Sequence, residues 1–118
     1  MRRKVDYLIF LHNGIGDLIM ALPCLEALGL SAPRNARILV YVKCEPSKKI
    51  VDLAELDDRF IVRILQRKLA AIECAFHRLN PPNYLFAPQA FGDWRMPLLA
   101  FLTGAKQRFG ISGQASII

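Results

Sequence analysis

Cysteine is scarce in this chain of 118 residues, and long apolar runs are missing from it. The three cysteines, Cys24, Cys44 and Cys74, lie far apart and form no Cys-x-x-Cys pair, so neither a disulfide framework nor a zinc site is expected. We therefore predict reduced and mostly buried thiols. No stretch reaches the roughly 18 apolar residues of a membrane span, and no cleavage site follows the basic start, which argues against a signal peptide.

The chain also lacks the aromatic residues interleaved with basic ones that stack bases in single-stranded nucleic-acid binders. Its 16 Lys and Arg exceed its 10 Asp and Glu, giving a formal net charge of +6. Such a balance favours acidic partners such as nucleic acid, anionic lipid or phosphorylated small molecules. Apart from Arg2, Arg3 and Lys4 the basic residues are scattered, so we expect no nucleic-acid partner.

Apolar residues are plentiful, at 53% of the chain, and they fall into a regular order. Five apolar runs, which begin 23 to 31 residues apart, have the spacing of successive βα units; they span residues 5–11, 36–42, 60–65, 83–88 and 106–111. Helical patterns lie between them, over residues 18–28, 46–56, 66–79 and 93–104. This alternation predicts the α/β class: one domain over residues 1–118, a Rossmann-like three-layer sandwich with a mostly parallel sheet of about five strands.

Three residues have predicted roles in the helices. Pro23 interrupts the helical pattern of residues 18–28, but the apolar face continues past it, so we expect a bent helix rather than a stop. Gly104 is placed to end the last helix as its C-terminal cap. His77, near the end of the third helical pattern, is expected to complement the helix dipole.

The segment HNGIGD, residues 12–17, follows the first predicted strand. Ligands bind outside the carboxyl ends of strands in open α/β sheets, and the start of the next helix attracts anions. Gly14 and Gly16 are expected to let the backbone turn sharply and approach a ligand. His12 has two open interpretations, a hydrogen bond to a sugar or phosphate and a structural bond to a neighbouring carbonyl, and Asn13 suits a turn. The segment is neither a P-loop nor a dinucleotide fingerprint.

Asp17 has two interpretations that the residues alone leave open. As a helix cap, its carboxylate accepts a backbone N–H bond at the start of the helix. As a functional group, the same carboxylate faces the crevice and takes a proton from a hydroxyl nucleophile. Outside this segment, Arg95 is the best candidate for binding an acidic ligand.

The stretch GIGDLIMALPCLEAL, residues 14–28, resembles the opening motif of glycosyltransferase family 9, the heptosyltransferases of lipopolysaccharide core synthesis. Gly16, Asp17, Pro23, Leu25 and Leu28 match, in order, the Gly-Asp, the Pro and the Leu-rich helix of that motif.

A second segment, LLAFLTGAKQRFG over residues 98–110, is similar to a later family segment in which small-Gly-Ala precedes a basic stretch. Gly92 and Arg95 stand where the family tends to have Gly and a basic residue. Gln89 and Phe91 stand where many members have Asp and Gln.

This resemblance implies that the chain is a truncated amino-terminal, acceptor-side domain of a two-domain enzyme of GT-B architecture. It implies that Asp17 is the base that activates the acceptor hydroxyl, and we assign acceptor binding to His12, Asn13, Gly14, Gly16 and Arg95. The ADP-heptose-like donor would be held by a carboxy-terminal domain to which nothing here corresponds. We therefore expect no metal or cofactor in this fragment and no activity from it alone.

The family's acceptors are anionic glycolipids at the inner face of the cytoplasmic membrane. The resemblance therefore implies a cytoplasmic location with peripheral contact to that membrane, to which Arg2, Arg3 and Lys4 would add attraction. The alternative is a non-enzymatic Rossmann-like module that binds an anionic small molecule or a partner protein.

Overall fold

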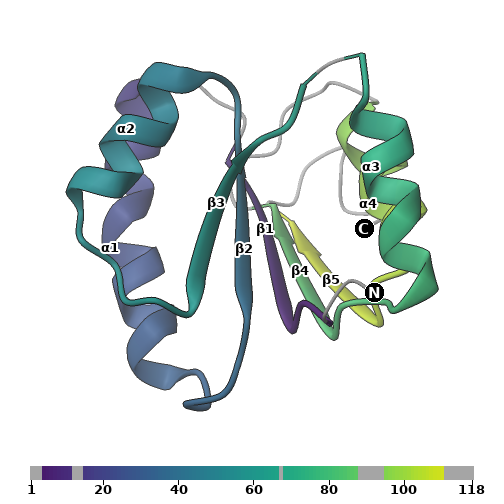
Figure 1. Cartoon of the computed structure of the whole chain (residues 1–118), viewed down its shortest axis with the longest axis horizontal. Helices are drawn as coiled ribbons and strands as arrows, with labels where there is room; N and C mark the ends of the chain where they lie inside the picture. Colours follow the sequence, from purple (N-terminus) through teal and green to yellow (C-terminus); the bar gives the residue numbers. More distant parts are fainter. Residues whose placement is uncertain (1–3, 12–14, 67, 88–94, 111–118) are drawn as a thin grey trace.

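A single sheet of five parallel strands lies at the centre of the computed structural model, which describes residues 4–11, 15–66, 68–87 and 95–110 (Figure 1). Its strands lie in the order β3-β2-β1-β4-β5 and all fall within the predicted apolar runs; they are β1 (Tyr7–Leu11), β2 (Ile38–Val42), β3 (Phe60–Ile64), β4 (Tyr84–Ala87) and β5 (Gln107–Gly110). This order matches the first five strands of the Rossmann order 3-2-1-4-5-6 and differs from the 2-1-3-4-5 order of flavodoxin-like folds.

Helices cover the sheet on both sides (Figure 1). One layer holds α1 (Ile15–Ser31) and α2 (Glu45–Leu53); the other holds α3 (Ala70–Phe76), the short 3-10 turn η1 (His77–Leu79) and α4 (Arg95–Thr103). The strand order explains this division, because right-handed crossovers that progress in opposite directions along a sheet place their helices on opposite faces. The predicted α/β three-layer fold is therefore confirmed.

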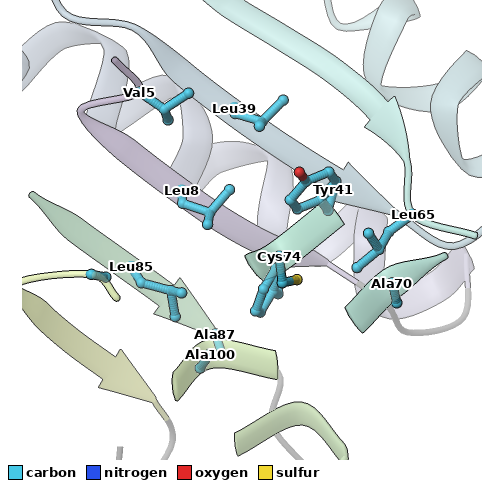
Figure 2. Packing of buried hydrophobic residues seen from close by; sticks show 12 residues of the cluster. Val5, Leu8, Leu39, Tyr41, Leu65, Ala70, Cys74, Leu85, Ala87 and Ala100 are labelled. Atoms are coloured by element: carbon cyan, nitrogen blue, oxygen red, sulfur yellow. The ribbon is translucent and has the colours of Figure 1, made fainter. Parts of the chain in front are cut away.

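The core divides in two because side chains of a strand alternate between the faces of the sheet. On β1, Leu8 and Phe10 point to the α3 and α4 layer, while Ile9 and Leu11 point to the α1 and α2 layer. Figure 2 shows the first of these clusters, in which Leu8, Leu39 and Leu85 from three neighbouring strands pack with residues of the helical layer. Every residue of β2 is buried, which explains its continuous apolar sequence.

Stacked aromatic rings extend the second cluster across β4 and β5. Tyr7 stacks on Tyr84 with ring centroids 5.3 Å apart, and Phe86 stacks on Phe109 at 5.2 Å. The rings come from residues in register on adjacent strands, so they lie face to face across the sheet. This row couples β5, at the edge of the sheet, to the central strand β1.

The first helix continues through Pro23 as predicted, and its carboxyl end is capped from a distant segment. The Arg59 guanidinium donates hydrogen bonds to the carbonyl oxygens of Gly29, Ala32 and Pro33, at or just beyond the end of α1. Asp57 accepts a bond of 2.6 Å from the same guanidinium, and this bond lowers the pKa of the Asp57 carboxyl. Free carbonyls at a helix end carry partial negative charge, so a cation there satisfies and stabilises them.

The third helix is shorter than predicted. The pattern over residues 66–79 indicated one helix, whereas α3 begins at Ala70 and changes to the 3-10 turn η1 at His77. Helices α2 and α4 agree more closely with prediction: Pro46 lies in the first turn of α2, and Gly104 follows the last residue of α4 with φ of +71°. Among the described residues, none of the helices has the length and apolar character needed to cross a membrane.

The positive φ of Gly104 gives a first prediction. An alanine at this position would be strained, and its Cβ would lie 3.1 Å from Cγ of Arg78, whose guanidinium caps α4 at the carbonyl oxygens of Phe101 and Leu102. We expect Gly104→Ala to lower the free energy of unfolding by about 1–2 kcal/mol in urea denaturation. Asn, which tolerates a positive φ better, should cost less than Ala; equal stability of Gly104→Ala and the parent chain would contradict this account.

Candidate functional site

The crevice where ligands bind in this fold class lies at the carboxyl ends of β1 and β4. These two strands are hydrogen-bonded neighbours, but the helices that follow them, α1 and α4, pack on opposite faces of the sheet. Such a switch point leaves a space between the two departing connections. Of the predicted binding residues, His12, Asn13 and Gly14 follow β1 directly and lie outside the described residues, so their roles stay predictions.

Gly16 lies inside the first turn of α1, which corrects its predicted place in the turn before the helix. A Cβ added to Gly16 would meet no atom of the described residues within 4 Å. Local packing therefore does not require glycine at this position. What its missing side chain provides is open space beside the start of the helix.

Asp17 is the third residue of α1 and lies in its first turn, and the helix-cap interpretation stays a prediction. An acidic residue in the first helical turn is still favoured there by the helix dipole. Its side chain lies outside the described residues, and its role as a base stays a prediction.

Arg95 is the first residue of α4, and its side chain likewise lies outside the description. Because α1 and α4 follow neighbouring parallel strands, the backbone brings Asp17 and Arg95 to the same edge of the sheet. They belong to helices on opposite faces, on either side of the switch point. The fold therefore brings these two predicted site residues to one edge, although they are far apart in the sequence.

Cys44 lies at the same edge, immediately before α2 and after β2. Its thiol is 3.5 Å from the hydroxyl of the buried Ser47, and hydrogen bonds from Ser47 lower the pKa of Cys44. Of the three thiols only Cys74 is buried, and burial raises its pKa to about 12; Cys44 is partly exposed and Cys24 is exposed. The expectation that the thiols are mostly buried is therefore wrong. Cys24 lies on α1 but outside the apolar face of that helix, so its side chain is exposed to solvent.

The three thiols should differ in their rates of alkylation. Because the thiolate is the reactive form, iodoacetamide near neutral pH should modify Cys44 first, Cys24 more slowly, and Cys74 only after unfolding. Replacing Ser47 by Ala removes the side-chain hydrogen bond, the larger of the two Ser47 bonds that lower the Cys44 pKa, and keeps the backbone bond. The rate at Cys44 should therefore fall, and its pH profile should shift part of the way upward. Mass spectrometry of each cysteine-containing peptide over time measures these rates. Faster labelling of Cys24 than of Cys44 would contradict the expected order.

A buried polar network, not foreseen from the sequence, joins the sheet to α3. The Tyr41 hydroxyl on β2 lies 2.8 Å from Oε2 of Glu73 and 2.9 Å from Nε2 of His77. Arg63 on β3 completes the network, with its Nε 3.3 Å from Oε2 of Glu73. His77 is therefore buried against the sheet, and the simple interpretation that it complements the helix dipole missed this contact.

The single proton of Tyr41 determines the direction of these bonds. Burial, followed by the hydrogen bond to Glu73, raises the pKa of Tyr41 above its ordinary value, so the hydroxyl stays protonated and donates to the Glu73 carboxylate. The Tyr41 oxygen then accepts a hydrogen from Nε2 of His77. The arrangement satisfies buried polar groups and holds α3 on the sheet, which is a positioning role.

Removing the Tyr41 hydroxyl tests that role. Tyr41→Phe keeps the ring but takes a partner from both Glu73 and His77, so we expect the free energy of unfolding to fall by about 1–3 kcal/mol in urea denaturation. Tyr84→Phe, which removes a partly exposed hydroxyl from β4, is the matched control and should change stability by less than about 0.5 kcal/mol. Equal effects of the two substitutions would show that the network adds nothing to stability.

Within the described residues, no group of three or more His, Cys, Asp or Glu side chains gathers as metal ligands. No protein-family model matches the chain, and searches of curated proteins and of solved structures found no significant match. The similarity to glycosyltransferase family 9 therefore stays a prediction from the residues.

Proposed function

We propose that the chain is the acceptor-side domain of a glycosyltransferase that moves heptose, or a related sugar, from a nucleotide-sugar to an acceptor of the lipopolysaccharide-core type. One observation carries the proposal: Gly16 and Asp17 form the first turn of α1, directly after the central strand, and Pro23 follows within the same helix. This is the Gly-Asp-Pro order of the motif that the sequence resembles. It occurs at the switch point where α/β folds bind ligands.

Asp17 is the proposed base of the reaction. As the acceptor hydroxyl oxygen forms a bond to the anomeric carbon of the donor sugar, the carboxylate takes the hydroxyl proton, and the bond from that carbon to the diphosphate oxygen breaks. The nucleoside diphosphate leaves with the bonding electrons. In this proposal a separate nucleotide-sugar-binding domain holds the donor and stabilises the departing diphosphate.

Two features of the described structure support acceptor binding at this edge. The space beside Gly16 is open, so an acceptor can approach the backbone at the start of α1. The starts of α1 and α4 both lie at this edge, and the unpaired N–H groups of a helix start attract anionic groups such as the phosphates and carboxylates of core sugars. Arg95, at the start of α4, is the proposed cationic partner of those groups.

A measurement of acceptor binding, made separately from sugar transfer, tests the proposal. The 118-residue chain, titrated with a lipid-A-core acceptor, should bind it and should not form product with ADP-heptose. Gly16→Ala fills the open space, so it should weaken acceptor binding about tenfold while raising the free energy of unfolding by about 0.5–1 kcal/mol, because Ala is the better helix former. Met20→Ala, an exposed change on the same helix, should leave acceptor affinity unchanged.

Transfer is measured in a protein that joins this domain to a nucleotide-sugar-binding domain. There Asp17→Asn should lower the rate by about 10²–10⁴-fold with acceptor affinity retained, and Glu26→Gln, which removes another α1 carboxylate, should leave the rate unchanged. A chain that binds no acceptor, but does bind a small anion or a partner protein, is instead a non-enzymatic module. Full activity of Asp17→Asn would remove Asp17 as the base.

A further inference from the structure

The first helix is apolar on the side that faces solvent as well as on the side that faces the sheet. Leu18, Ala21 and Leu25 are buried in the core between α1 and the sheet (Figure 1). Its exposed apolar and small residues recur every three or four positions and so lie along the opposite side of the helix. We call this set the α1 stripe; it consists of Gly16, Ile19, Met20, Pro23, Ala27 and Leu30.

Charged residues are scarce in this helix. Two of its 17 residues are charged, Asp17 and Glu26, whereas α2 in the same layer has four charged residues among nine. The large side chains of the stripe are exposed, Leu30 at 90% and Met20 at 76%. A helix that is apolar on all sides is normally buried on all sides. The outer side of α1 therefore suits a second apolar surface that covers it.

The α1 stripe is complementary to itself about a two-fold axis at Pro23. When two copies of α1 run antiparallel across such an axis, each residue meets the one that lies equally far from Pro23 in the opposite direction. Leu30 then lies opposite Gly16 of the second copy, and Ile19 lies opposite Ala27. Both pairs join a large side chain to a small one, and the space beside Gly16 is free of other described atoms.

We propose that the α1 stripe is the contact surface of a homodimer in which the two copies of α1 pack antiparallel. Side chains of one helix fit between those of another when large and small residues alternate in this way. Antiparallel packing also brings the positive end of each helix dipole beside the negative end of the other. A contact between two single helices is small among protein interfaces, so we expect a dissociation constant on the order of 10 µM.

This dimer does not depend on sugar transfer, although it involves the same part of α1. Leu30 of the second copy would cover the space beside Gly16, which the proposed acceptor also uses. Dimer formation is therefore measured without acceptor, and acceptor affinity is measured well below the dimer dissociation constant, where the chain is monomeric. Failure of the transfer reaction would leave self-association unchanged, so the two proposals are tested separately.

Sedimentation velocity over a range of chain concentrations tests the proposal. The 118-residue chain should change from monomer to dimer as its concentration rises. Leu30→Gln should weaken the dimer about tenfold or more, because two buried leucine side chains are lost from each dimer. Leu79→Gln removes the same side chain at a similar exposure, 83%, from η1 in the other layer and should leave dimer formation unchanged.

An exchange of large and small residues tests the two-fold match itself. Ala27→Leu adds apolar surface but fills the space that Ile19 of the second copy needs, so it should weaken the dimer about tenfold. Nonspecific apolar adhesion would instead be strengthened by the added leucine. Ile19→Ala should also weaken the dimer, and the double variant with Ile19→Ala and Ala27→Leu should recover much of the lost affinity, because it restores one large and one small residue in each pair.

Cys24 reports where the two copies meet. Its exposed thiol is one residue from the proposed axis, so the two Cys24 residues of a dimer should lie about 8–10 Å apart, the usual distance between packed helices. A bismaleimide of matching length should link two copies through Cys24 in a Cys44→Ser background, in which serine remains a good helix-capping residue. Adding Leu30→Gln should lower the yield of linked dimer.

Four results would overturn the proposal. They are a parent chain that stays monomeric at every concentration, equal effects of Leu30→Gln and Leu79→Gln, a dimer strengthened by Ala27→Leu, and a dimer that Cys24 does not link. The substituted positions are exposed, so the variants should retain the fold, which circular dichroism checks.

Discussion

The structure depends on the hydrogen bonding of β1 on both of its sides. β2 pairs along one side and β4 along the other, although α1 connects β1 to β2 while β4 comes much later in the chain. The two-sided pairing divides the helices between the two faces and creates the switch point at the carboxyl end of β1. It also buries both faces of the strand, which requires apolar residues at successive positions from Leu8 to Leu11.

The two edges of the sheet, one where the helices begin and one where they end, differ in electrostatic character. Helices α1, α2 and α4 begin at the carboxyl edge of the sheet, so their partially positive ends gather where the candidate site lies. Their partially negative ends lie at the opposite edge. Two of these ends are capped by arginines from distant segments, Arg59 on α1 and Arg78 on α4. The caps offset the negative ends of α1 and α4.

The sequence predicted the fold well because its strongest signals are local. Each strand is a short apolar run, and Pro46 and Gly104 mark helix ends through their backbone preferences. The start of α3 was predicted too early, and its apolar residues Leu69, Ile72 and Phe76 look in sequence like a buried face although they are exposed. Only the three-dimensional contact with Tyr41, 32 residues before Glu73, shows which side of α3 is inward. The sequence signal available for this inward side was a carboxylate and a histidine four residues apart, Glu73 and His77. Of the candidate site, the fold fixes the backbone positions of Gly16, Asp17 and Arg95, whereas His12, Asn13 and Gly14 lie outside the described residues.

The pairing of Tyr7 with Tyr84 also has a consequence for the order in which the molecule is assembled during synthesis. β2 is made soon after β1 and can pair with it early, while the other edge of β1 stays open until β4 has left the ribosome. At roughly 5–20 residues per second this interval lasts several seconds. An open apolar strand edge can pair with other chains during that time. The nascent half-sheet is therefore most exposed to aggregation, and most in need of a chaperone, before β4 arrives.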